Sequence, residues 1–279
     1  MIPARLAEPL PLPLPFGPNG TPRQVGVEIE IAGLGAREAA DLLRQLRGGQ
    51  VIEQDPYRFQ VAGTAHGDVT VELDLRLAHP PKDAGPCRRL SARAVGLVAS
   101  RFAQVEMIFP PLLPERLSEI DLLIQELIEC APGLQVDGPH LNPEVASVDP
   151  AYLVAHLRAF SQLAPRLRAE MGLRPPGRIG FVTSFPPAYQ ELITDPDYRP
   201  DLGRLIDDYL DANPTRYREL DLLPLLMFLA QYRVRSRLWL QKINPRPVFH
   251  WRMPGARPFA GVVKDWNRWI TVERLASGC

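Results

Sequence analysis

Residues 25–31 read Val-Gly-Val-Glu-Ile-Glu-Ile, and this segment decides how the rest of the fold is interpreted. Every second residue is apolar, and Glu28 and Glu30 lie between the apolar positions. Because successive side chains of a strand point to opposite faces of a sheet, the alternation predicts a half-buried strand over residues 23–31. The polar face of this strand then carries two carboxylates ~7 Å apart.

The next extended segments repeat this acidic pattern. Residues 57–64 and 68–78 predict two strands, and the second alternates as strictly as the first. Its apolar side is valine and leucine, and its polar side includes Glu72 and Asp74. A second strand therefore presents a pair of carboxylates on one face.

Two shorter strands add further polar side chains. Residues 104–109 predict a strand that carries Glu106, and the two prolines that follow are expected to end it. Residues 134–145 predict another strand, which carries His140 and Asn142 on one side. Each strand thus contributes at least one oxygen or nitrogen ligand.

The other regular segments are mainly helical. Helices are expected over residues 34–46, 88–102, 115–130, 150–170, 201–211, 225–239 and 264–278, and two more strands over residues 178–184 and 247–253. Hairpin-spaced strands with separate helices predict an α+β domain with a mainly antiparallel sheet and helices packed on one face. Leu-Pro repeats predict that residues 1–22 form a separate, extended N-terminal arm.

The acidic strands predict a metal site if they are neighbours in one sheet. Glu28, Glu30, Glu72, Glu106 and His140 would then converge on its open face, and so many like charges require a cation. Mg²⁺ or Mn²⁺ fits, because hard cations bind carboxylate oxygens. The alternative is that these are the solvated outer faces of amphipathic strands, although Glu and Asp are disfavoured in strands.

A basic segment near the end of the chain could bind the opposite charge. Residues 242–252 contain Lys242, Arg246, His250 and Arg252, and the period of a strand places His250 and Arg252 on one face. Arginine as a planar fork and lysine as a point charge could hold phosphates. Taken alone, the segment is better explained as a strand with a solvated edge, and phosphate binding is favoured only by its combination with the acidic strands.

Composition excludes several classes of function. The 279 residues are 46% hydrophobic and contain 32 basic and 32 acidic residues, which predicts a folded protein with no overall attraction to nucleic acid or anionic membranes. No stretch approaches the ~18 apolar residues that span a bilayer. Three widely spaced cysteines without a C-x-x-C pair favour a reducing cytoplasm.

Common nucleotide and hydrolase motifs do not fit the sequence. Gly33 and Gly35 lie between a predicted strand and a helix, but Glu38 occupies the third glycine position of a dinucleotide-binding fingerprint. The sequence contains no P-loop, no H-E-x-x-H and no G-x-S-x-G. ATP, if it is used, is therefore not held by a P-loop.

The ordered set of motifs resembles the amidoligase family, distant relatives of glutamine synthetase and of the glutamate-cysteine ligases. The strand with Glu28 and Glu30 resembles that family's opening G-x-E-x-E strand, and Val-Glu72-Leu-Asp resembles its second acidic strand. Glu106-Met-Ile-Phe-Pro-Pro-Leu-Leu is similar to its E-[IL]-V-S-P-P-L segment. Gly-Pro-His140-Leu-Asn is similar to its G-x-H-x-[HN] strand, and residues 245–252 to its closing basic strand.

The resemblance implies a fold and an activity. The fold would be a curved, mainly antiparallel sheet of the glutamine-synthetase-like catalytic type, formed by residues 23–279. The activity would be ATP- and Mg²⁺-dependent joining of a carboxylate to an amine or ammonia through an acyl phosphate. Two positions depart from the family pattern: Phe109 replaces a small serine, which would change the shape of the pocket, and Asn142 replaces a histidine, which puts one ligand in question.

The resemblance also implies roles for single residues. Glu28, Glu30, Glu72, Glu106 and His140 would hold Mg²⁺ or Mn²⁺, with Glu28, Glu30 and Arg252 acting in catalysis. Lys242, Arg246, His250 and Arg252 would bind the nucleotide, and the arginines would stabilise the acyl phosphate.

The resemblance leaves the substrates and two other functions open. The substrates would be a small-molecule or peptide carboxylate and an amine, and a glutamine amidotransferase could supply ammonia. One alternative is a catalytically inactive partner subunit that binds a nucleotide or peptide. The other is a metal-dependent amide hydrolase.

Overall fold

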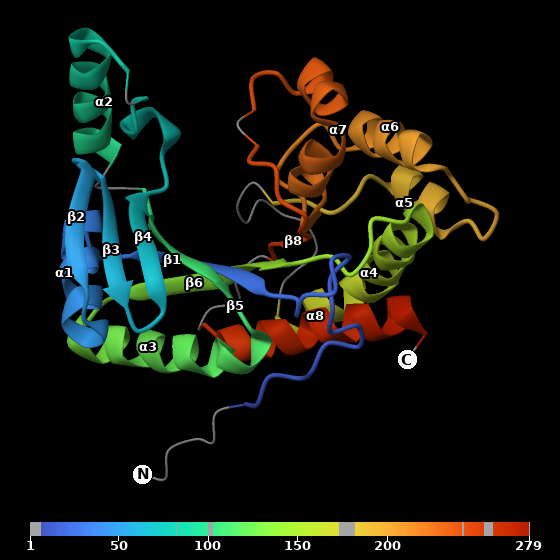
Figure 1. The fold of residues 1–279 in the computed structure, drawn as a ribbon, viewed down its shortest axis with the longest axis horizontal. Helices are drawn as coiled ribbons and strands as arrows, with labels where there is room; N and C mark the ends of the chain where they lie inside the picture. The colour runs from blue at the N-terminus through green and yellow to red at the C-terminus, as the bar shows by residue number, and fades with distance from the viewer. Residues whose placement is uncertain are drawn as a thin grey trace. The chain divides into compact units, whose positions relative to one another are not determined.

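The computed structural model describes residues 7–81, 83–99, 103–172, 182–241, 243–253 and 259–278. Eight strands occur in these ranges (Figure 1). They are β1 (Val25–Ala32), β2 (Gln50–Asp55), β3 (Arg58–Thr64), β4 (Gly67–Leu73), β5 (Val105–Leu112), β6 (Gln135–Pro143), β7 (Leu220–Asp221) and β8 (His250–Trp251).

The same ranges contain eight α-helices and two short 3₁₀ helices. The α-helices are α1 (Ala36–Arg47), α2 (Pro86–Ala99), α3 (Leu117–Cys130), α4 (Pro150–Glu170), α5 (Pro187–Thr194), α6 (Leu202–Ala212), α7 (Leu223–Arg237) and α8 (Val262–Ser277). The 3₁₀ helices are η1 (Arg76–Ala78) and η2 (Pro114–Arg116). No helix of the described residues is both long and apolar enough to cross a membrane.

The strands form a sheet in the order β2-β3-β4-β5-β1-β6-β8-β7. Strands β2 and β3, β3 and β4, β4 and β5, β6 and β8, and β7 and β8 pair antiparallel. The predicted α+β class with an antiparallel sheet is therefore confirmed.

The chain divides into two compact units. Unit 1 comprises Met1–Val25, Leu112–Ser118 and His140–Cys279, and unit 2 comprises Gly26–Pro111 and Glu119–Pro139. Strands β1 and β6 each contain residues of both units. The two units are described separately below.

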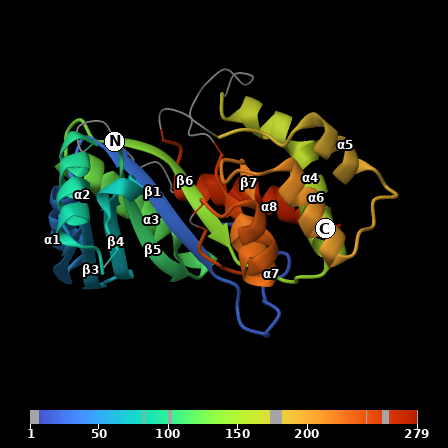
Figure 2. The same ribbon diagram turned by 90° about the horizontal axis from the view of Figure 1, so that it is seen from above.

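In unit 2, helix α1 packs against strands β2, β3 and β4, as Figures 1 and 2 show. Alternate residues of β1, β3, β4 and β5 are buried, including Val27, Val71 and Met107. Ala39 and Leu43 supply the buried face of α1. Burying a large apolar side chain contributes ~1.5–3 kcal/mol, so this alternation fixes which face of the strands is left for polar residues.

In unit 1, helices α4 and α8 lie side by side (Figures 1 and 2). Asp149 caps α4 by accepting a hydrogen bond from Ala151 N, and Pro150 follows at the first helical position. Trp266 and Trp269 of α8 are fully buried, and the ring of Trp269 lies 5.6 Å from that of Trp251 in β8. The aromatic core of unit 1 therefore holds β8 against α8.

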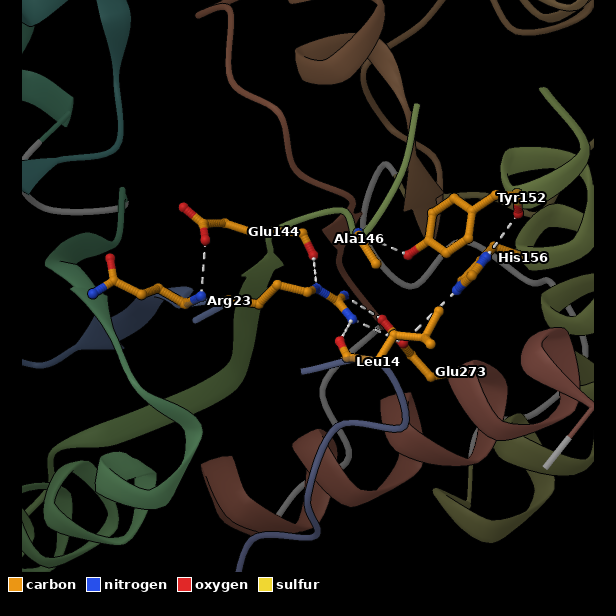
Figure 3. Close-up of polar contacts among 8 residues, drawn as sticks. Leu14, Arg23, Glu144, Ala146, Tyr152, His156 and Glu273 are labelled. Atoms are coloured by element: carbon orange, nitrogen blue, oxygen red, sulfur yellow. Dashed lines mark hydrogen bonds and ion pairs between the residues drawn. The ribbon is translucent and has the colours of Figure 1, made fainter. Parts of the chain in front are cut away.

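The described part of the N-terminal arm contacts α8. The indole N–H of Trp266 donates to Leu10 O, and Leu10 N donates to Asn267 Oδ1. Figure 3 shows a buried network behind this contact, in which Arg23 donates to both carboxylate oxygens of Glu273 at 2.5 and 3.1 Å. The arm is therefore held against α8 at Leu10, whereas its separation as a domain remains a prediction.

Some predicted strands have different ends. Strand β4 ends at Leu73 and not at residue 78, because Leu75 N turns back to Leu73 O and η1 follows. Leu77, predicted on the apolar side, is 69% exposed. Strand β5 includes Pro110 and Pro111, which lie beyond its pairing with β4 and so remove no hydrogen bond from that ladder.

Three elements were not predicted, and two predicted strands differ. Strands β2 and β7 and helix α5 have no clear period in the sequence, since β2 is largely exposed and β7 has two residues. The strand expected over 247–253 is reduced to His250–Trp251. Residues 178–181 lie outside the described residues, and of the strand expected over 178–184 Thr183 makes one isolated bridge to Arg218.

Candidate functional site

Strand β1 positions the first two predicted site residues as expected. Val25, Val27, Ile29 and Ile31 are 0–1% exposed, so the apolar face is fully covered. Glu28 and Glu30 point to the other face of the sheet; Glu28 is buried and Glu30 is half-buried. The polar face of β1 is therefore not bulk solvent, as the alternative of a solvated strand would require.

Strands β4 and β5 bring two more carboxylates together. Glu72 of β4 and Glu106 of β5 are direct cross-strand partners. Side chains in such a pair are separated by ~4.5–5.5 Å at Cβ, and like charges placed in this way are destabilising. The register of the sheet therefore places the carboxylates of Glu72 and Glu106 in an unfavourable contact.

The order of the strands brings the acidic side chains together, because β5 lies between β4 and β1. Burial raises the pKa of Glu106 well above its usual value, and the charges of Glu28, Asp74, Glu30 and Glu72 raise it further, in that order. Four carboxylates from β1, from β4 and from the residue that follows β4 thus act on one group. We refer to these five residues as the acid cluster.

Arg58 of β3 forms an ion pair with the acid cluster in unit 2. It lies directly opposite Glu72 and donates from Nε to a carboxylate oxygen of that residue. Burial is the main cause of the raised pKa of Glu106, and the charges of the four neighbouring carboxylates add to it. Hard carboxylate oxygens at such density suit Mg²⁺ or Mn²⁺.

In unit 1, β6 and β8 bring polar side chains together. His140, Asn142 and His250 are buried, at 4%, 2% and 7% exposure. His250 Nδ1 lies 2.8 Å from Asn142 Oδ1, and the rings of His140 and His250 are 5.6 Å apart. Asn142 therefore orients His250 with Nδ1 as the donor, so that Nε2 is the nitrogen suited to bind a metal.

Arg252 follows β8 and contacts the same histidine group. Its Nη2 lies 3.4 Å from His140 Nδ1, and its backbone N–H donates to Glu219 O. Within the described part of the chain, Arg252 Nε is buried without a hydrogen-bond partner. A buried, unsatisfied guanidinium N–H is costly unless a ligand accepts from it.

Asp221 is a functional candidate that the sequence reasoning missed. It pairs across β7 and β8 with His250, and burial raises its pKa to about 6 despite hydrogen bonds from Leu223 N and Tyr209. The available signal was a single acidic residue in the most apolar stretch of the sequence. A buried carboxyl beside a candidate ligand histidine is the arrangement that tunes metal or proton chemistry.

Three further positions singled out in the sequence are Arg246, Lys242 and Phe109. Arg246 lies on the loop before β8, where its backbone N–H donates to Pro224 O. Lys242 lies outside the described residues. Phe109, expected to change the shape of the pocket, is 3% exposed and points to the buried face of β5, opposite to Glu106, because the two differ by an odd number of positions.

Carboxylate and imidazole side chains of the described residues form candidate metal-binding groups. The candidate ligands are Glu28, Glu30 and Glu106 of unit 2 and His140 and His250 of unit 1. His250 was predicted to bind the nucleotide and joins this set because Asn142 orients it. The carboxylates of unit 2 are chemically suited to Mg²⁺ or Mn²⁺.

The comparisons with known proteins give one result. A sequence model of the family described as “Putative amidoligase enzyme” matches residues 21–272. No curated protein and no solved structure matches the chain. The match covers both units and contains every predicted site residue.

Proposed function

The chain belongs to the amidoligase family, and from this premise we propose that it is an ATP- and Mg²⁺-dependent ligase that joins a carboxylate to an amine or ammonia. The observation that carries the proposal is the acid cluster. A fold selected for stability alone would not place Glu106 opposite Glu72 with three further carboxylates acting on it. Such a cluster is useful when divalent cations neutralise it.

The proposed metal ligands are Glu28, Glu30, Glu72, Glu106 and His140. When bound, Mg²⁺ supplies positive charge that stabilises phosphate oxygens during phosphoryl transfer. The carboxylates of unit 2 would be held ready by the sheet, because the buried face of each strand fixes its backbone. Mn²⁺ would bind the same oxygens.

The proposed phosphate-binding residues are Lys242, Arg246, His250 and Arg252. The best supported of these is Arg252, because its Nε is buried without a partner among the described residues and therefore needs an acceptor. A phosphate or acyl-phosphate oxygen would satisfy it. His250 is equally suited to bind metal through Nε2, since Asn142 occupies Nδ1.

The proposed reaction has two steps. The substrate carboxylate oxygen attacks the γ-phosphorus of ATP, a bond forms between them, and the bond from that phosphorus to ADP breaks. The amine nitrogen then attacks the acyl carbon, phosphate leaves, and the amine loses a proton. Glu28 and Glu30 would hold the cation near the transferred group and Arg252 would stabilise its charge, so catalysis rests on preorganised electrostatics and not on a covalent enzyme intermediate.

The test is ATP turnover that depends on the acid cluster. The protein is incubated with ATP, Mg²⁺ and pooled amino acids and amines, and ADP, phosphate and new amides are measured. We expect turnover to fall by at least ~100-fold in a Glu28→Gln, Glu30→Gln double variant. The matched control is Glu53→Gln, which removes an exposed carboxylate of β2 outside the cluster.

Three outcomes of this test separate the candidate functions. Equal turnover in the wild type and the double variant contradicts the ligase. Tight ATP binding without hydrolysis favours an inactive partner subunit. Amide hydrolysis that needs metal but not ATP favours a hydrolase, and thermal shifts with Mg²⁺ alone and with Mg²⁺ plus ATP separate it from the ligase, because a ligand stabilises the state that it binds.

The substrate and partner assignments are part of the same proposal. The acceptor would be a small-molecule or peptide carboxylate, and the nitrogen would come from an amine or from ammonia supplied by a glutamine amidotransferase. We place the reaction in the cytoplasm on the basis of the cysteine content.

A further inference from the structure

Arg58 extends the acid cluster by one strand. It lies on β3 directly opposite Glu72 of β4, which in turn lies opposite Glu106 of β5. The three residues therefore form one row across three neighbouring strands, with successive strands ~4.8 Å apart. A guanidinium at the end of this row is within one side-chain length of a cation held by Glu72.

The hydrogen bonding of Arg58 leaves most of its donors available. Its Nε donates to Glu72, and it makes no other side-chain hydrogen bond to a described residue. The side chain of Arg58 is 26% exposed and that of Glu72 is 19% exposed. The pair is therefore largely shielded from water but still accessible to a small ligand. The two Nη groups form a planar fork that matches the oxygens of a carboxylate or a phosphate.

Metal binding to Glu72 would leave Arg58 able to pair with an anion. A divalent cation that takes the oxygens of Glu72 removes the negative charge that now pairs with the guanidinium. Arg58 and the metal would then repel each other across a few ångströms in a half-buried site. An oxyanion held between the two cations removes this repulsion, and it accepts hydrogen bonds from the Nη groups.

We propose that Arg58 is an oxyanion-binding residue of the active site, released from Glu72 by the metal and paired with a carboxylate or phosphoryl oxygen of a substrate. This inference rests on the proposed function, because it requires a divalent cation in the acid cluster. It assigns to unit 2 a substrate contact that neither the sequence motifs nor the family match provides.

A purely structural ion pair predicts different behaviour. A cross-strand Arg–Glu pair would only hold β3 to β4, and its loss would weaken the sheet and every ligand site on it. An oxyanion-binding Arg58 competes with the metal for Glu72 and helps to hold the anion. Removing it should therefore strengthen the binding of metal alone and weaken the binding of the anion, and these two effects have opposite signs.

The experiment measures both affinities in Arg58→Gln and Arg58→Lys. Calorimetry with Mn²⁺ alone should give several-fold tighter binding to Arg58→Gln than to the wild type. With Mn²⁺ saturating, inorganic phosphate and ADP form one arm and acetate the other, and the anion in contact with Arg58 should bind ~10-fold more weakly or worse. Arg58→Lys should keep part of the affinity, because it retains the charge without the fork.

The control is Arg47→Gln, which removes another arginine of unit 2 that pairs with a glutamate, Glu126, outside the acid cluster. It should leave both affinities unchanged. Weakening in the phosphate arm alone identifies a phosphoryl contact, and weakening in the acetate arm alone identifies a carboxylate contact; either supports the proposal.

Unchanged anion affinities in Arg58→Gln, or weaker Mn²⁺ binding together with weaker anion binding, overturn the role of Arg58 and leave the ligase proposal intact. No Mn²⁺ binding to the wild type overturns both. Circular dichroism of each variant verifies that the fold is retained, and a fold lost in Arg58→Gln but kept in Arg58→Lys with unchanged affinities also overturns the role.

Discussion

Two glutamates in sheltered positions, Glu273 of unit 1 and Glu106 of unit 2, respond to the fold in opposite ways. Burial alone would raise both pKa values. Contacts with His156 and Arg23 reverse the effect for Glu273 and lower its pKa, whereas neighbouring carboxylates add to the effect for Glu106 and raise its pKa. Neighbouring positive groups thus lower the pKa of Glu273, and neighbouring carboxylates raise that of Glu106.

The comparison separates a buried carboxylate that has a cationic partner from one that lies among other carboxylates. Glu273 accepts two hydrogen bonds from Arg23, and His156 Nε2 lies 3.8 Å away, too far to donate but close enough to act electrostatically (Figure 3). Every partner is within the unit. Glu106 instead lies among like charges, so an added cation would favour its carboxylate form.

The largest effect is expected from Arg23→Met, which breaks the compensated site. Both side chains of the Arg23–Glu273 pair are 0% exposed, so the variant leaves a buried carboxylate without its partner. We expect the free energy of unfolding to fall by ~3–5 kcal/mol, measured by urea denaturation. The double variant Arg23→Met, Glu273→Leu should recover most of this loss, because no charge is then buried. A double variant as unstable as the single one would contradict the interpretation.

The second largest effect is expected from Glu106→Gln, which removes one negative charge from the acid cluster. Each unfavourable carboxylate contact costs up to ~1 kcal/mol, so the metal-free protein should gain ~1–3 kcal/mol at pH 8. The raised pKa of Glu106 fixes the sign: wild-type stability is present at low pH and is lost as the pH rises through that pKa. The two proteins should therefore diverge as the pH increases.

Metal reverses this second comparison. Saturating Mg²⁺ should stabilise the wild type at pH 8 and have a smaller effect on Glu106→Gln, because a neutral amide is a poorer ligand. Thermal unfolding with and without Mg²⁺ measures the difference. Equal Mg²⁺ shifts in the two proteins would remove Glu106 from the proposed metal ligands.

The acid cluster was predictable because it follows a local period. Glu28, Glu30 and Glu72 alternate with buried apolar residues, and the fold buries those residues as the alternation requires. Glu106 is in a short strand of the same pattern. The sequence could not establish that β4 pairs with β5 in the register that places Glu72 opposite Glu106, because register depends on contacts between segments far apart in the chain.

The residues that escaped prediction lack such a period. Arg58 becomes meaningful only once β3 pairs with β4, and Asp221 once β7 pairs with β8. Strand β7 is too short to alternate, and Asp221 in an apolar stretch could equally have been a break in a helix. The prediction that the strand extends to residue 78 was wrong for the opposite reason. The apolar–polar alternation of the sequence continues beyond Leu73, the last residue of β4 that pairs with β5.

The third effect, about 1 kcal/mol, is expected from His79→Gln. This variant removes the ion pair of His79 with Asp55, a largely buried pair of unit 2. His79 Nδ1 lies 3.0 Å from Asp55 Oδ2, and Nε2 lies 2.8 Å from Leu73 O. Both partners are acceptors, so both ring nitrogens donate when the imidazole is protonated. Burial lowers the pKa of His79, but these hydrogen bonds outweigh it and the net pKa is raised.

The sign of the pH dependence follows from both partners. The contribution of His79 is fully present below its usual pKa near 6.5 and is lost as the pH rises through the raised value. Hydrogen bonds lower the pKa of Asp55 although burial opposes them, so its contribution is lost as the pH falls through the lowered value. His79→Gln should therefore be destabilising at pH 5–6 and nearly neutral at pH 9, and equal losses at both pH values would contradict the protonated bridge.

The smallest effect is expected from Arg166→Met, the same substitution as Arg23→Met at an exposed pair. Arg166 Nε lies 2.8 Å from Glu170 Oε1, one helical turn along α4 in the same unit, with side chains 71% and 43% exposed. Water screens this pair, and its loss leaves Glu170 solvated, so the free energy of unfolding should fall by only ~0.2–0.5 kcal/mol and by less in high salt. Urea denaturation of the two Arg→Met variants side by side then isolates burial as the variable. If Arg166→Met cost as much as Arg23→Met, the large effect would belong to arginine as a residue type. The loss of stability in Arg23→Met could then not be attributed to the burial of its ion pair.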